Sequence, residues 1–179
     1  MKQENRKKPT EVWYGVTPPT PIGQIWTAVS DEGLVAVRIR GTEEEFVAMV
    51  NGLTRLEPSY APERISVTAV LQQLIEYTAG TRREFQIPIC WQILTPFQEA
   101  ALRQVHAIPY GQTRTYGQIA QILGKPGASR AVGRANATNP MPIIIPCHRV
   151  LDSRGQLHGY GAGLETKAWL LRLEGSWLL

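Results

Sequence analysis

One cysteine followed directly by a histidine and an arginine is the part of this sequence best suited to covalent chemistry. Cys147, His148 and Arg149 follow the apolar run 143–145 and Pro146. A thiol with an ordinary pKa of about 8.5 is a weak nucleophile near neutral pH, and a neighbouring imidazole and guanidinium would favour the thiolate. The pattern indicates a reactive cysteine. The alternative is a small buried side chain at the end of a strand.

The composition narrows the class of protein. A chain of 179 residues, 43% hydrophobic and 19% charged, is typical of a globular protein with one or two domains. With only Cys90 and Cys147 and three scattered histidines, it favours neither a disulfide framework nor a metal site, and indicates a reducing, intracellular setting. No apolar run could span a bilayer, and the charged residues 1–9 resemble a disordered tail, not a signal. We therefore expect no membrane partner, and a cytoplasmic location, or a nuclear one in a eukaryote.

Positive charge is concentrated in the second half of the chain. Residues 95–179 contain nine Lys and Arg against four Asp and Glu, whereas residues 1–94 contain ten against eleven. A cationic half suggests a polyanionic partner, for which nucleic acid is the usual candidate. An ordinary solvated basic face is the alternative.

The first half reads as strands followed by helices. We expect strands at 12–16, 24–29 and 34–40, helices at 43–50 and 67–77, and an extended segment at 85–93. Residues 30–33 predict a hairpin turn in which Gly33 supplies a positive φ. This order predicts a small α+β unit.

The second half carries clearer helix signals. Thr95–Gln98 and Thr115–Gln118 read as capping boxes, which would begin helices at 96–106 and 116–123. Further helices are expected at 128–137 and 164–173. The pair 116–123 and 128–137, separated by a glycine-containing turn, predicts a helix-turn-helix, with Arg130 and Arg134 on its second helix facing DNA. Packing of that helix against another helix is the alternative.

A reactive cysteine close to a DNA-binding helix pair suggests thiolate chemistry performed on DNA. The sequence here resembles the O6-alkylguanine-DNA alkyltransferases over residues 90–175. The matching residues are Tyr116, Arg130–Gly133, Asn139–Ile143, Pro146–Val150, Gly159–Tyr160, Gly163, Trp169–Leu171 and Glu174–Gly175. The resemblance implies an α+β fold with a tail at 1–9, a small N-terminal α/β domain at 10–92, and a mostly helical C-terminal domain at 93–179. The latter would bind DNA and accept the alkyl group.

The resemblance also implies roles for the site residues. Cys147 would accept the alkyl group irreversibly from O6-alkylguanine, or from O4-alkylthymine. His148 would act as base through a water, Glu174 would orient it, and Asn139 would tie the helix-turn-helix to the cysteine segment. Each molecule would act once, without a cofactor or metal.

Duplex DNA containing O6-alkylguanine is the implied partner, bound through the minor groove with the damaged base flipped out. Arg130 would fill the space left behind, and Tyr116 would help to rotate the nucleotide. The remaining DNA contacts would come from Ala128, Ser129, Ala131, Gly133 and Arg134. The pocket would consist of Tyr116, Pro142, Val150, Tyr160, Gly161 and Ala162. Gly161 stands where the family often has serine, so a backbone donor is kept and a side-chain donor is lost.

We expect a stand-alone monomer, with several copies along DNA as a further option. Two rival functions fit parts of the pattern. A cysteine hydrolase would use Cys147, His148 and Glu174 on a small amide or ester and turn over repeatedly. A non-catalytic DNA-binding regulator would not need the thiol.

Overall fold

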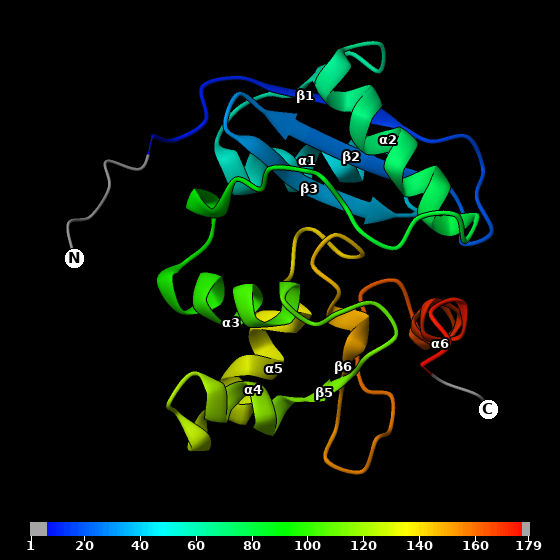
Figure 1. Cartoon of the computed structure of the whole chain (residues 1–179). Coiled ribbons are helices and arrows are strands. Elements are labelled where there is room, and N and C mark those ends of the chain that lie inside the picture. The colour runs from blue at the N-terminus through cyan, green and yellow to red at the C-terminus, as the bar shows by residue number, and fades with distance from the viewer. Residues whose placement is uncertain (1–6, 177–179) are drawn as a thin grey trace. The chain divides into compact units, whose positions relative to one another are not determined.

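In the computed structural model, which describes residues 7–176, the chain divides into two units between Leu94 and Thr95 (Figure 1). The first contains a sheet flanked by helices and the second is mostly helical, which confirms the α+β class. Residues 1–6 of the predicted tail lie outside the described residues, and Lys7–Pro9 have no regular structure. Among the described residues, no helix is long and apolar enough to cross a membrane.

Four strands form the sheet of the first unit. They are β1 (Val12–Val16), β2 (Ile25–Ser30), β3 (Gly33–Ile39) and β4 (Ser59–Tyr60), in the order β3-β2-β1-β4. The β1–β2 and β2–β3 pairs are antiparallel, while the short β4 pairs with β1 in parallel. The predicted hairpin between β2 and β3 is confirmed: Gly33 has a φ of +121°, and Ser30 Oγ accepts a hydrogen bond from Glu32 N.

Two helices, α1 (Glu43–Thr54) and α2 (Ile65–Thr78), cover opposite faces of this sheet (Figure 1). The alternation of β1 explains this arrangement. Tyr14 points to α1, with its ring 6.1 Å from that of Phe46. The neighbouring Gly15 faces α2, and a Cβ there would lie only 3.0 Å from Val67 Cγ1. Glycine therefore lets α2 approach the strand closely.

The segment 85–93 differs from its prediction as an extended element. It forms one parallel bridge, between Ile89 and Leu34, and ends in a 3-10 turn, η1 (Trp91–Ile93). Leu34 N donates to Pro88 O and Cys90 N donates to Leu34 O. Because Pro88 has no N–H to donate, the pairing does not extend into a strand.

The second unit packs three helices together, with a fourth beside them. These are α3 (Pro96–His106), α4 (Tyr116–Ile122), α5 (Ser129–Ala137) and α6 (Leu164–Leu173). A 3-10 turn, η2 (Pro126–Ala128), connects α4 to α5. A second 3-10 turn, η3 (Cys147–Arg149), precedes β6 (Val150–Leu151), which pairs in parallel with β5 (Arg114–Thr115).

The helix starts follow the capping prediction with one difference. Thr115 and Gln118 form a complete capping box at α4. At α3, Thr95 Oγ1 accepts from Gln98 N, but the Gln98 side chain donates to Thr138 instead of returning to Thr95. Gln98 thereby links the start of α3 to the end of α5.

The apolar run before the cysteine is not a strand. Ile143 has a φ of +73°, and Ile145 N donates to Met141 O, so residues 141–145 form a turn. Isoleucine rarely adopts this left-handed conformation, and it is tolerated where surrounding contacts enforce it. All three isoleucines are buried. The cysteine is therefore presented from a constrained turn and not from the end of a strand.

Candidate active site and nucleic-acid interface

The carboxylate of Glu174, at the end of α6, forms hydrogen bonds with two other parts of the second unit, η3 and the segment between α3 and β5. Its Oε1 lies 2.9 Å from His148 Nε2 and accepts from Arg149 Nη2 at 2.8 Å. Its Oε2 accepts from Arg149 Nε at 2.9 Å and from Gly111 N at 3.3 Å. His148 is fully buried, and Glu174 and Arg149 are each 6% exposed. The structure thus brings together His148 and Glu174, which are 26 residues apart.

The electrostatics of this cluster define the state of the imidazole. Burial raises the pKa of Glu174, but hydrogen bonds from His148 and Arg149 outweigh it and lower that pKa to about 2. Burial lowers the pKa of His148 against the opposing effect of Glu174. Near neutral pH a neutral imidazole therefore donates its Nε2–H to an ionised carboxylate, which leaves the lone pair on Nδ1. That tautomer suits a general base.

The cysteine itself is held at the first position of η3. Cys147 N donates to Ile145 O at 2.8 Å, and the residue is 7% exposed. Burial raises the pKa of the thiol, while a hydrogen bond with Asn139 and the positive charge of Lys167 oppose that rise. The resting group is therefore a neutral thiol that needs a base to become a nucleophile.

The cation that favours the thiolate is not the one suggested by the sequence. The Arg149 guanidinium, which we expected to act on Cys147, binds Glu174 and donates to Ile108 O. Lys167 on α6 takes that role instead. It is fully buried, and its Nζ donates to Val150 O at 2.7 Å and to His158 O at 2.9 Å. Sequence reasoning missed Lys167, although a lysine on the apolar face of a predicted helix, beside Ala168 and Leu171, was a usable signal.

Asn139 joins the end of α5 to the cysteine turn. Its Nδ2 donates to Ile145 O at 2.9 Å, and its Oδ1 accepts from Met141 N at 3.0 Å. Both amide atoms are used, so the side chain bridges the two ends of the turn that contains Ile143. Asn139 also contacts the thiol, and therefore couples the helix pair to the cysteine.

Helix α5 presents a small, basic outer face. Arg130, Ala131 and Arg134 are exposed, while Val132 and Ala135 point inward. Ala128 and Ser129, at the start of the helix, are half-buried. The structure therefore brings the predicted DNA residues onto one surface with two arginines one turn apart.

Gly133 is half-buried, unlike the exposed residues of that face, because it lies beside a tyrosine ring. A Cβ at this position would lie 3.9 Å from two ring atoms of Tyr116. Its small size therefore accommodates the Tyr116 ring at the start of α4. Burial, reinforced by Cys147 and Asp152, raises the pKa of Tyr116, so its phenol stays protonated. Tyr116 thus lies beside α5 and within electrostatic reach of Cys147.

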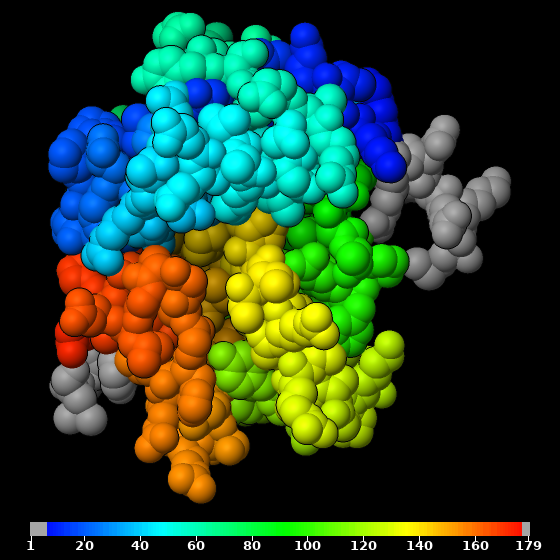
Figure 2. Space-filling view, turned by 180° about the vertical axis from the view of Figure 1, so that it is seen from behind, coloured from blue at the N-terminus to red at the C-terminus, as the bar shows by residue number. Residues whose placement is uncertain are grey.

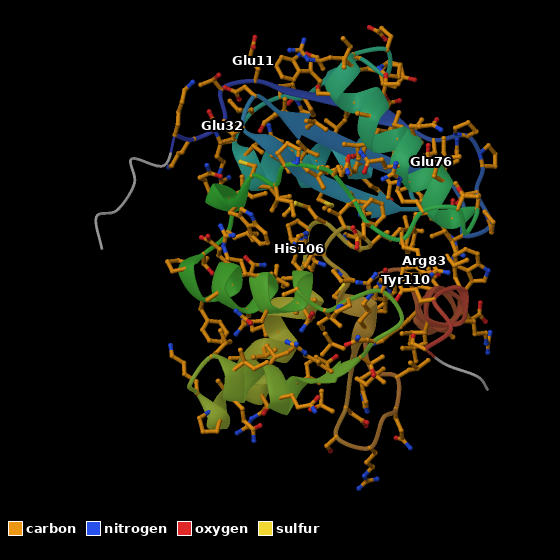
Figure 3. All side chains as sticks on the ribbon, in the orientation of Figure 1. Glu11, Glu32, Glu76, Arg83, His106 and Tyr110 are labelled. Atoms are coloured by element: carbon orange, nitrogen blue, oxygen red, sulfur yellow. The ribbon has the colours of Figure 1, made fainter. Side chains whose placement is uncertain are left out.

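A second tyrosine supports the same framework from the segment between α3 and β5. Tyr110, labelled in Figure 3, donates its hydroxyl hydrogen to Leu173 O at 2.9 Å. Its ring centroid lies 5.8 Å from the Arg149 guanidinium carbon. This contact fixes the end of α6, from which Glu174 extends.

The predicted pocket residues fall into two groups. Pro142, Tyr160 and Ala162 are half-buried and Gly161 is exposed, whereas Val150 is fully buried and uses its carbonyl to accept from Lys167. The Tyr160 ring meets His148 edge-on, with centroids 6.4 Å apart. The loop residues are therefore accessible, and Tyr160 connects them to the imidazole.

The chemistry of this arrangement is activation of one thiol beside a basic helix. No group of three or more His, Cys, Asp or Glu side chains able to hold a metal is found within residues 7–176.

Comparisons with known proteins point to one family. The family model for the DNA-binding domain of 6-O-methylguanine DNA methyltransferase matches residues 96–176. The methylated-DNA–protein-cysteine methyltransferase of Methanosarcina acetivorans is 40% identical over 159 residues, covering 88% of this chain and 95% of the relative. The protein of that name from Shigella flexneri is 40% identical over 164 residues, covering 89% and 94%.

Solved structures agree with these sequence matches. A crystal structure of Mycobacterium tuberculosis OGT in complex with DNA superposes with a TM-score of 0.76 at 36% identity, covering 92% of this chain and 93% of that one. The M. tuberculosis O6-methylguanine methyltransferase gives a TM-score of 0.75 with the same identity and coverage. Together with the buried Cys147–His148–Glu174 arrangement, these matches show that the chain belongs to the methylated-DNA–protein-cysteine methyltransferase family.

Proposed function

We propose that this protein repairs duplex DNA by transferring the alkyl group of O6-alkylguanine, or of O4-alkylthymine, irreversibly to Cys147 Sγ. The observation that carries the proposal is the buried His148 imidazole, next to Cys147 in the sequence, whose Nε2 lies 2.9 Å from Glu174 Oε1. This is the nucleophile, base and orienting group that an activated thiol requires.

The reaction balances with the groups of this site, the substrate and one water that relays a proton. His148 accepts the thiol proton through a water, and the resulting thiolate attacks the alkyl carbon. The S–C bond forms as the C–O6 bond breaks, and the proton passes to the departing guanine. Because the thioether that remains on Cys147 is not reversed, each molecule acts once.

Positive charge and backbone donors favour this displacement. Lys167 stabilises the thiolate from its buried position, which counters the cost of burying that charge. We propose that a backbone N–H in the segment 160–162 donates to O6 as negative charge develops there. The exposed Gly161 leaves this approach unobstructed by a side chain.

DNA is the partner of this surface. We propose that the small exposed face of α5 enters the minor groove, where its contacts are to phosphate and groove shape with little sequence readout. Arg130 occupies the stack in place of the flipped base, because a guanidinium is planar and can stack and hydrogen-bond. Tyr116, already close to Cys147, contacts the rotated nucleotide. We further propose that the protein acts as a monomer, alone or as several copies along DNA, in the cytoplasm or in a eukaryotic nucleus.

Intact-mass spectrometry tests the central step. The protein is incubated with a duplex carrying one O6-methylguanine. We expect a gain of one methyl group per chain, mapped to Cys147, which Cys147→Ala abolishes and Cys90→Ala leaves unchanged. The buried Cys90 lies in the first unit and serves as the matched control. Absence of methylation would defeat the proposal, and repeated turnover without stable modification would favour a hydrolase.

A second experiment tests the role of Arg130 in base flipping. Arg130→Ala should slow repair of the duplex substrate at saturating DNA far more than transfer from free O6-benzylguanine, because only the duplex requires extrusion. The matched Arg134→Ala variant should instead weaken DNA affinity and reduce its salt dependence by about one counterion. Equal losses on duplex and free base would contradict the assigned role of Arg130.

A further inference from the structure

The loop between β6 and α6 carries three of the proposed pocket residues but has little intrinsic rigidity. It contains Gly155, Gly159, Gly161 and Gly163, and a Cβ at any of them would meet no atom within 4 Å. Gly155, Gly159 and Gly163 also have positive φ. Figure 2 shows this segment, in orange, projecting from the surface. A chain of this kind has many accessible conformations unless other groups fix it.

Asp152 fixes the first half of this loop. Its Oδ1 accepts from Arg154 N at 2.8 Å and from Gln156 N at 2.7 Å. Two backbone bonds close the same turn, from Asp152 N to Gln156 O and from Gly155 N to Asp152 O. Each of the backbone N–H groups bound by the carboxylate would otherwise depend on solvent, so Asp152 determines the shape of residues 152–156.

The second half is held at His158 by two independent contacts. His158 Nε2 lies 3.3 Å from Asp152 Oδ2, and His158 O accepts from Lys167 Nζ. The same Nζ donates to Val150 O. Val150 is the first residue of β6, which leads into the loop. A buried lysine on α6 thus joins the two ends of the 151–158 segment, and Asp152 joins them again through side chains. We call Asp152, His158 and Lys167 the loop brace.

The brace stands next to the reacting groups. His158 lies two residues before Tyr160, whose ring meets His148. Lys167, which holds His158, is also the cation acting on Cys147. β6 leads into the loop directly beside β5 and the start of α4, where Tyr116 lies. These contacts hold the chain up to His158, and the 160–162 segment that follows is further attached to α6 by a hydrogen bond from Thr166 Oγ1 to Ala162 O.

From this geometry we propose that Asp152 is a positioning residue for alkyl transfer, which sets the 160–162 segment through the loop brace before the base arrives. The inference rests on the proposed function and extends it. If the 160–162 segment is already held in its reactive position, no ordering cost is paid when the base binds. A displacement of about 1 Å at such a site can slow a reaction about 100-fold. In the proposed function, affinity for DNA depends on the α5 face, to which none of the brace contacts described above extends.

The test compares Asp152→Ala with Asp152→Asn, and uses Ser153→Ala as the matched control in the same turn. The asparagine keeps an oxygen for the two N–H groups of residues 154 and 156 but loses the charge that pairs with His158. We measure single-turnover transfer from O6-methylguanine duplex at saturating protein, transfer from free O6-benzylguanine, and duplex affinity.

We expect Asp152→Ala to slow transfer from both substrates by about 10- to 100-fold with unchanged DNA affinity. Asp152→Asn should recover most of that loss, and Ser153→Ala should match the wild type. An Asp152→Ala protein that reacts at the wild-type rate, or an asparagine variant as slow as the alanine one, would overturn the proposal. A parallel loss of DNA affinity would overturn it too.

Amide hydrogen exchange tests the brace independently of activity. In the wild type, the amides of Arg154 and Gln156 should be protected, and His158→Ala should accelerate exchange in residues 158–162. Rapid exchange of the Arg154 and Gln156 amides in the wild type would contradict the proposed loop brace, even if every variant were folded and active. Failure of the wild type to accept any methyl group, with these amides protected, would instead count against the proposed function.

Discussion

The two units differ in what they bury. Within the described residues, the buried polar side chains of the first unit are uncharged: Thr17, Thr27, Ser30, Gln73 and Thr78. The second unit buries ionisable groups: Glu99, His148, Arg149, Lys167 and Glu174. Burying charge costs free energy that contacts within the protein must offset, so an apolar core is the simpler route to stability. Apart from Glu99, these groups gather at the turn that holds Cys147, as a reaction centre requires.

The positive charge of the second half is partly buried and partly exposed. Two of the nine cations in residues 95–179, Arg149 and Lys167, are buried and serve the site. Arg130 and Arg134 remain exposed on α5. Part of the positive charge of the second half is therefore buried at the site, and part is exposed on the α5 face that we propose binds DNA.

The largest effect should come from removing the shared carboxylate of the buried cluster. Glu174→Ala leaves Arg149 buried without its carboxylate and His148 without its orienting group. We expect a loss of about 3–5 kcal/mol in the free energy of unfolding and at least about a 100-fold slower transfer from free O6-benzylguanine. Urea unfolding and single-turnover kinetics measure the two effects.

Glu99→Ala is the matched control for that prediction. Glu99 is also a buried carboxylate of the second unit, and it pairs with Arg103 on the same helix. This variant should lose stability but retain alkyl transfer in the folded molecules. If Glu174→Ala transferred alkyl groups at the wild-type rate, the buried charges of the second unit would be structural only.

A substitution in the core of the first unit should lower stability without changing the rate of alkyl transfer. Phe46 is fully buried and packs against Tyr14 and Trp26. Phe46→Ala should lower the free energy of unfolding by about 3–5 kcal/mol. The rate of transfer from O6-benzylguanine, measured per folded molecule, should stay unchanged. A slower reaction in molecules that remain folded would show that the chemistry is not confined to the second unit.

A third prediction uses the pH dependence of the buried lysine. Burial lowers the pKa of Lys167 to about 8, whereas an unfolded lysine titrates near 10.4. The folded state therefore disfavours the charged form: the cost is complete below pH 8 and disappears as pH rises toward 10.4. Relative to Lys167→Met, the protein with Lys167 should gain stability from pH 8 to 10.

Both proteins should carry Cys147→Ala in that experiment, so that titration of the thiol does not contribute. Unfolding free energies across the pH range give the difference between them. A constant difference between the Lys167 pair would mean that burial does not perturb this lysine.

Local signals made much of this fold predictable. The helix starts at Thr95 and Thr115 and the turn at Gly33 follow from short-range hydrogen bonding and backbone sterics, which neighbouring residues determine. The two-residue strands β4, β5 and β6 were missed, because they are too short to show any alternation. The Ile143 turn was missed because an apolar, β-branched run is typical of a strand.

The site was predictable where its residues are neighbours in the sequence. Cys147 and His148 are adjacent, but the residues that determine their protonation come from elsewhere. The contact between His148 and Glu174 depends on where α6 ends, and a single sequence does not define that geometry. Arg149 was assigned to the thiol on adjacency alone, whereas tertiary packing directs it to Glu174 and places Lys167 in its stead.

The smallest effect provides the most closely matched test, because each unit contains a helix begun by a threonine capping box. Thr42 caps α1 in the first unit and Thr115 caps α4 in the second. Replacing either by alanine should cost about 1 kcal/mol of unfolding free energy. Only Thr115→Ala should also slow repair of methylated duplex, because the first residue of α4 is Tyr116. Transfer from free O6-benzylguanine should decline less in that variant, since no nucleotide has to be rotated. Equal repair by the two variants would mean that the cap of α4 supports only the fold, and the distinction between the units would then rest on the buried charges alone.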